Sequence, residues 1–180
     1  ASSPEVKAWM TAQDDLARKE LGKLPVRGKL LARLKELAYV DSVSAPVRRG
    51  AFTFLERRHA TKEKSIVYWK EGKSGEEKVL LDPNTWSQDG SASLGGWQPS
   101  WDGSRVAYLV KANNSDEATL RVIDVATAKV SEVDVIEGAK YASASWMPDG
   151  SGFYYTWLPT DRKIPVDERP GYQEVRFHRL

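Results

Sequence analysis

Two Asp-Gly-Ser tripeptides with similar flanks constrain the fold of this chain more than any other feature. They begin at Asp102 and Asp149, 47 residues apart, and each follows a tryptophan-containing segment and precedes an aromatic, strand-like one. The central glycine of each supplies the positive φ that a tight antiparallel turn requires. A repeat of this length, with room for about four short strands, is typical of a β-propeller blade. A β-sandwich with two turns that resemble each other by chance is the alternative.

Nearly the whole chain after residue 41 has the two-residue periodicity of β-strands. Short runs rich in β-branched and aromatic residues alternate with turn residues, which predicts an antiparallel meander. The predicted strands cover residues 51–56, 65–70, 78–81, 105–111, 119–125, 130–136, 141–147, 153–157 and 173–179.

The beginning of the chain has helical periodicity instead. Ser3 is placed to cap a helix with Pro4 at its first position, and Gly22 is placed to end it. A second helix follows, with leucines on one face and mostly basic side chains on the other. The sequence therefore predicts a helical segment over residues 1–41 and propeller blades over residues 42–180.

Composition excludes several classes of function. The 27 Lys and Arg residues are nearly balanced by 25 Asp and Glu, so the net charge of +2 suggests neither a nucleic-acid partner nor an anionic membrane surface. No apolar run approaches the roughly 20 residues that cross a bilayer. With no cysteine, the chain has no disulfide and no thiolate nucleophile or metal ligand. The cytoplasm and the bacterial periplasm both remain open as compartments.

The motifs that carry catalytic chemistry are incomplete in this chain. Gly150-Ser151-Gly152 lacks the full Gly-x-Ser-x-Gly pattern of a nucleophile elbow and is interpreted as a hairpin turn. Gly72-Lys73-Ser74 resembles the end of a phosphate-binding loop, but Val67 stands where that loop needs a glycine. The two histidines, His59 and His178, have no metal-ligand spacing and are expected on surface strands or loops. We therefore expect no catalytic residue, no metal site and no cofactor in this chain.

Aromatic residues are more numerous than a small core requires. Most are expected to fill the gaps between neighbouring blades, while some line a binding surface. For Tyr141, core packing and an exposed position near a cavity both remain open. The chain has room for little more than two blades, whereas propellers close with about 4 to 8, and residues 173–180 form an unfinished strand pattern. We expect the chain to be the front part of a longer protein.

Several separated blocks resemble the amino-terminal region of the prolyl oligopeptidase family. The similar blocks cover residues 4–13, 79–84, 133–141 and 145–155, and residues 167–172 are similar to the bacterial prolyl endopeptidase branch. The resemblance extends over essentially all 180 residues, in order and with matching gaps. It implies a mainly β fold with amino-terminal helices, in which this chain forms part of a seven-bladed propeller of antiparallel four-stranded blades.

The family resemblance also implies a function. Such an enzyme is a serine peptidase that cleaves short peptides after proline, with the propeller gating access to a triad in a separate α/β-hydrolase domain outside this chain. The implied partners are short proline-containing peptides and the rest of the same polypeptide, namely the hydrolase domain, against which the helices pack, and the later blades. The full-length enzyme is expected to be a monomer.

Two residues of this chain match functional positions of the family. Tyr141 matches a propeller aromatic, phenylalanine in some relatives, that contacts substrate residues upstream of proline. Its hydroxyl adds a donor and an acceptor that phenylalanine lacks. Asp116 matches an acidic residue that pairs with an arginine of the hydrolase domain, and a solvated loop carboxylate is the alternative for it. Two other functions remain open for the chain, a non-catalytic propeller that serves as a binding module and a related oligopeptidase with basic-residue specificity.

Overall fold

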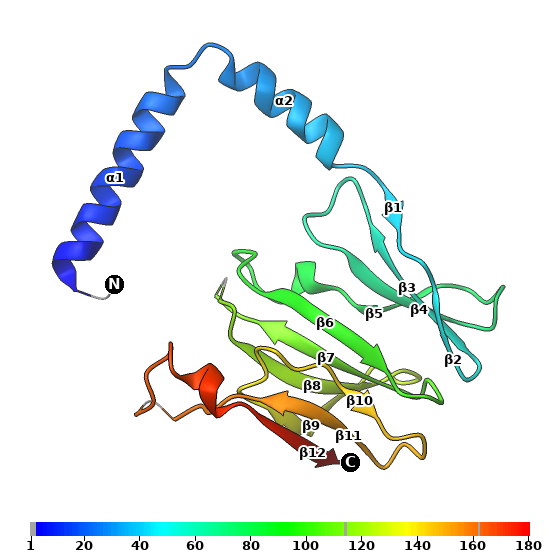
Figure 1. The fold of residues 1–180 in the computed structure, drawn as a ribbon. Helices are drawn as coiled ribbons and strands as arrows, with labels where there is room; N and C mark the ends of the chain where they lie inside the picture. The colour runs from blue at the N-terminus through cyan, green and yellow to red at the C-terminus, as the bar shows by residue number, and fades with distance from the viewer. Residues whose placement is uncertain (1–2, 114, 162) are drawn as a thin grey trace. The chain divides into compact units, whose positions relative to one another are not determined.

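A computed structural model describes residues 3–113, 115–161 and 163–180 (Figure 1). Contacts within the chain divide it into two units, Ala1–Val40 and Asp41–Leu180. The first unit is helical, and the second contains all the strands of the described residues. That the helical segment over residues 1–41 and the blades over residues 42–180 are separate domains remains a prediction.

The helical unit consists of α1 (Pro4–Gly22) and α2 (Arg27–Ala38). The Val6 N–H donates to the Ser3 side chain at 3.3 Å, so Ser3 caps α1 as the sequence predicts. No described residue of either helix is buried, although both helices carry large apolar side chains. An amphipathic helix is normally stabilised by burial of its apolar stripe. Within the described part of the helical unit, that apolar stripe is exposed to solvent.

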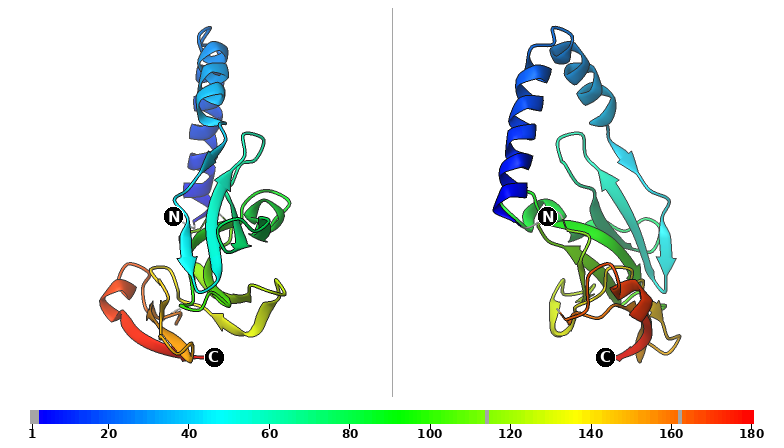
Figure 2. Two further views of the ribbon diagram at one scale, coloured as in Figure 1. Left: turned by 90° about the vertical axis from the view of Figure 1, so that its right-hand side faces the viewer. Right: turned by 60° about the vertical axis from the view of Figure 1, so that its left-hand side comes forward.

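The β unit contains three antiparallel sheets in the described residues (Figures 1 and 2). Sheet A has five strands, sheet B has four and sheet C has three. Sheet A consists of β1 (Ser42–Val43), β2 (Val47–Arg49), β3 (Phe52–Arg58), β4 (Ile66–Glu71) and β5 (Lys78–Leu81). Sheet B consists of β6 (Ser93–Pro99), β7 (Arg105–Lys111), β8 (Ala118–Asp124) and β9 (Val130–Ile136). Sheet C consists of β10 (Ser145–Trp146), β11 (Gly152–Trp157) and β12 (Glu174–Arg179). Two short 3₁₀ helices, η1 (Pro83–Thr85) and η2 (Arg169–Tyr172), lie in the connections.

The antiparallel meander predicted from the sequence is confirmed, with differences at β1, β2, β6 and β10. The strand predicted over residues 141–147 shrinks to Ser145–Trp146, because the Ala142 N–H turns back to the Ala139 carbonyl at 2.9 Å. Strands β1, β2 and β6 were not predicted. The first two are very short, and β6 contains two glycines, which weaken a strand pattern.

Sheet B is apolar on both faces, and each face packs against a different sheet. Successive residues of β7 alternate between two cores, because side chains of a strand point to opposite faces. Val106 and Tyr108 lie in a cluster with sheet A, whereas Ala107 and Leu109 lie in a cluster with sheet C. This burial explains the nearly continuous apolar run of β7 and is how propeller blades pack. A two-sheet sandwich, in which each sheet has one covered face, does not fit this arrangement.

The two Asp-Gly-Ser turns have the same backbone hydrogen bonds. In the first, the Ser100 N–H donates to the Arg105 carbonyl at 2.9 Å and the Gly103 N–H donates to the Ser100 carbonyl at 3.0 Å. The turn at Gly150 repeats both bonds, at 2.9 and 3.0 Å, between residues shifted by 47 positions. Gly103 has φ 77° and Gly150 has φ 73°, as the turn chemistry requires. The sequence repeat is therefore also a structural repeat.

The two turn glycines differ in their surroundings, and this difference gives a matched test of sheet packing. A Cβ at Gly103 would lie 2.6 Å from the Arg49 carbonyl oxygen of sheet A, whereas a Cβ at Gly150 would meet no atom within 4 Å. Gly150→Ala should cost only the left-handed backbone strain, about 1–2 kcal/mol. Gly103→Ala should cost about 1–3 kcal/mol more, because sheets A and B must also move apart. Urea unfolding measures both, and equal losses would contradict the close approach of the two sheets.

A carboxylate in the first turn makes the fold sensitive to acid. Burial raises the pKa of Asp102, but hydrogen bonds from Ser100 and Ser104 outweigh it and hold the pKa below its usual range. The ionised form therefore contributes stability above about pH 4, and this contribution is lost as the pH falls through the pKa of the folded state. We expect the stability difference between wild type and Asp102→Asn, measured by urea unfolding, to shrink from about pH 7 to about pH 3. A difference that stays constant would contradict the assignment, and Asp167→Asn, at an exposed carboxylate, serves as control.

Candidate functional site

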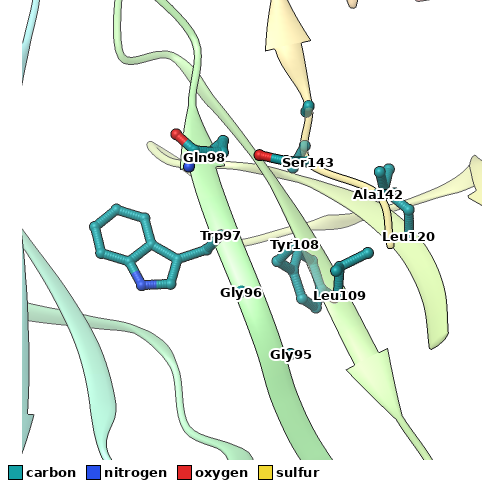
Figure 3. Close-up of a pocket in the computed structure, with 11 residues that line it drawn as sticks. Gly95, Gly96, Trp97, Gln98, Tyr108, Leu109, Leu120, Ala142 and Ser143 are labelled. Carbon is teal, nitrogen blue, oxygen red and sulfur yellow. The ribbon is translucent and has the colours of Figure 1, made fainter. Parts of the chain in front are cut away.

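A pocket of about 170 Å³ lies between β6 of sheet B and the segment that leads into β10 (Figure 3). Gly95, Gly96 and Gln98 line it from β6, and residues 142–144 line it from the opposite side. We call this pocket the β6 notch. Gln98 and Ser143, both exposed, bring an amide and a hydroxyl to it. None of the described residues that line the notch is charged, so it offers neutral hydrogen-bonding groups.

The close approach of β7 to β6 favours glycine at position 95 of the notch. The register between β6 and β7 shifts between Leu94 and Gly96, which marks a β-bulge. A Cβ at Gly95 would lie 3.0 Å from the Leu109 Cβ, so a larger residue at this position would require the Leu109 side chain to shift. The sequence analysis missed this site, although adjacent glycines inside an otherwise extended segment indicate a bulge.

A second, charged pocket of about 390 Å³ also contains Gly95 and Gly96. Glu56 and Lys64 are among its lining residues. The Trp97 indole N–H donates to the Glu56 carboxylate at 2.5 Å and so joins sheet B to sheet A. The Gly95-Gly96 bulge therefore lies between a neutral pocket and a charged one.

Tyr141 lies immediately before the residues that line the notch. Its side chain is exposed, with 54% of the residue accessible, and the Lys140 Nζ lies 5.5 Å from its ring centroid. The sequence left open whether Tyr141 packs in the core or is exposed, and in the structure it is exposed. Contact between Tyr141 and substrate remains a prediction.

Asp116 lies in the loop between β7 and β8 and does not line the notch. Its side chain is 76% exposed, and one of its oxygens lies 3.4 Å from the Lys111 Nζ. An exposed pair of this kind contributes little to stability. Pairing with an arginine of another domain remains a prediction.

The two histidines form hydrogen bonds away from the notch. The His59 Nε2 lies 2.9 Å from the Tyr68 hydroxyl, and the His178 Nε2 lies 2.7 Å from an Asp134 oxygen, a contact that joins sheet C to sheet B. Burial raises the pKa of Tyr108, and the nearby Arg121 partly offsets this. Among the described residues, no group of three or more His, Cys, Asp or Glu is placed to hold a metal ion. Within the same residues, no helix is both long and apolar enough to span a membrane.

Antiparallel sheets that pack in succession, with a notch between β6 of one sheet and the segment leading into β10 of the next, define part of a β-propeller. The family model described as the N-terminal β-propeller domain of prolyl oligopeptidase matches residues 1–180. The chain belongs to this family.

Individual relatives agree with the family assignment. The prolyl endopeptidase of Elizabethkingia miricola is 27% identical over 177 residues, which cover 98% of this chain and 25% of the relative. A structure from a study of two prolyl endopeptidases is 59% identical with a TM-score of 0.96, over 99% of this chain and 26% of that one. Prolyl oligopeptidase B from Galerina marginata, bound to a 35mer substrate, shares the fold at 22% identity with a TM-score of 0.83, over 100% of this chain and 28% of that one. The chain thus spans about a quarter of the length of its curated relatives.

Proposed function

We propose that this chain is the propeller part of a prolyl endopeptidase that hydrolyses short peptides on the carboxyl side of proline. The observation that carries the proposal is 59% identity over 99% of the chain to a structure from the study of two prolyl endopeptidases. Residues 1–180 also match the family's propeller domain over their full length.

In the proposed enzyme, the chain controls access and the chemistry lies elsewhere in the polypeptide. The family resemblance implies a serine, histidine and aspartate triad in an α/β-hydrolase domain. There the serine attacks the proline carbonyl, the histidine transfers the proton, and hydrogen-bond donors stabilise the oxyanion. The propeller sheets form the wall of a cavity that admits only short, loosely folded peptides.

The helical unit supports the proposal of a second domain. Its apolar side chains, including Trp9, Leu16 and Leu34, are exposed within the unit. Exposed apolar side chains in such number are expected at an interface. We assign the hydrolase domain of the same polypeptide as its partner, with Asp116 as a second, polar contact from the propeller. The proposed enzyme is a monomer of the bacterial cytoplasm or periplasm.

Tyr141 is the proposed substrate contact of this chain. Its exposure and its position beside the β6 notch support this role. The ring offers an apolar face to residues upstream of proline, and the hydroxyl offers one donor and one acceptor.

Substrate preference tests the proposed activity. The full-length protein should cleave a Gly-Pro anilide and leave an arginine anilide nearly untouched, whereas residues 1–180 alone should cleave neither. Release of the chromophore measures the cleavage of each anilide by each protein. Preference for arginine would support an oligopeptidase with basic-residue specificity, and no cleavage by the full-length protein would favour a binding module. Cleavage by the isolated segment would contradict the placement of the triad outside it.

Tyr141 variants test the proposed substrate contact. In the full-length enzyme, Tyr141→Ala should raise the KM for a peptide with several residues upstream of proline by about fivefold to tenfold, because the contact surface is lost. Tyr141→Phe should retain most of the affinity if the ring face makes the contact. Steady-state kinetics measures both variants, with Tyr172→Ala as control at another exposed tyrosine. An unchanged KM for Tyr141→Ala would remove this residue from the substrate cavity.

A further inference from the structure

Two tryptophans join sheets B and C next to the β6 notch. The Trp101 indole N–H donates to the Trp146 carbonyl at 3.0 Å. The Trp146 indole N–H donates to the Gln98 carbonyl at 2.9 Å. We call this pair of hydrogen bonds the tryptophan clasp. Each bond links β6 or the turn that follows it to Trp146 of β10.

Packing in the core holds Trp146 in place in addition to its two hydrogen bonds. It is only 8% exposed, and its ring packs edge-on against Phe153 with the centroids 4.9 Å apart. Trp101 is 54% exposed, with the Arg49 guanidinium 4.9 Å from its ring centroid. The clasp therefore has one member fixed in the core and one member at the surface.

The clasp fixes one end of the segment that carries Tyr141. The other end is fixed by the Ala139 N–H, which donates to the Ala118 carbonyl of sheet B at 3.1 Å. Between these anchors, Ala142 and Ala144 are buried in the core shared by sheets B and C. Tyr141 and Ser143 alternate with them and are exposed. Because little of Tyr141 is packed, its position depends on the backbone between the two anchors.

We propose that Trp101 and Trp146 are positioning residues for substrate selection. Through the clasp they hold the Tyr141 segment against β6 and set the width of the β6 notch. The notch is uncharged, so the substrates that depend on it are peptides with neutral residues upstream of proline that reach the propeller wall. The inference rests on the proposed peptidase function and adds two residues, neither of which touches the substrate, to its specificity.

Tryptophan-to-phenylalanine variants of the full-length protein test this proposal. Trp146→Phe and Trp101→Phe each keep an aromatic ring and remove one N–H of the clasp. Trp86→Phe is the matched control, because Trp86 packs near Tyr108 with ring centroids 5.9 Å apart, and the described residues show no hydrogen bond from its indole. Each variant is assayed with a short Gly-Pro anilide and with a longer neutral peptide that contains one internal proline.

The expected result is a substrate-dependent change in KM. Each clasp variant should raise the KM for the longer peptide by about threefold to tenfold, with kcat unchanged and the KM for the short anilide within about twofold of wild type. The control variant should lower the thermal midpoint without separating the two substrates. A purely structural clasp would lower the thermal midpoint and leave both KM values unchanged.

Other outcomes would contradict the proposal or show whether the proposed function or only this inference is wrong. Equal changes in KM for the two substrates, or the same change in Trp86→Phe, would remove the special role of the clasp. Trp101→Phe keeps the test valid if Trp146→Phe fails to fold, because Trp101 lies largely at the surface. If the wild-type protein cleaves neither substrate, the proposed function fails and this inference fails with it. If wild type cleaves both and the clasp variants match it, only this inference fails.

Discussion

The structure depends on the burial of both faces of sheet B. Val106 and Tyr108 pack toward sheet A, while Ala107 and Leu109 pack toward sheet C, so neither neighbouring sheet can be removed without exposing a core. Each large apolar side chain that is fully buried contributes roughly 1.5–3 kcal/mol. Hydrogen bonds then fix how the sheets meet, from Trp97 to Glu56 between sheets A and B and through the tryptophan clasp between sheets B and C. Hydrophobic burial thus makes the sheets stack, and these few polar contacts set their relative positions.

The same stacking produces the candidate site. Where β6 faces the segment that leads into β10, small residues leave the β6 notch open, and the tight bulge at Gly95 favours a residue without a side chain. The exposed Tyr141 immediately precedes Ala142, which lines this notch. In the proposed function, this wall contacts the peptide substrate, and another part of the polypeptide cleaves the bond. This division of roles is what the proposed peptidase function requires of a propeller.

The sequence predicted the elements whose signals are local. The bounds of β5, β7 and β9 agree with the predicted ranges, because turn residues and apolar runs mark both ends of each strand. Strand β6 was missed, because Gly95 and Gly96 obscure its pattern, and the close approach of β7 that favours glycine at position 95 is visible only in the structure. The strand expected from Tyr141 onward was too long, because the turn at Ala142 depends on contacts of this segment with sheet B. The notch and the clasp join residues more than 40 positions apart, which periodicity alone cannot reveal. The roles of Tyr141 and Asp116 came from the family resemblance and remain predictions.

The most direct measurement is a crystal structure of the full-length protein with a proline-containing peptide bound. The account predicts that sheets A, B and C form successive blades around a cavity that contains the peptide. It also predicts that Tyr141 and the β6 notch lie on the wall of that cavity, with the peptide's proline at a serine of a separate domain. A peptide bound away from this wall, with Tyr141 facing bulk solvent on the outside of the propeller, would contradict it.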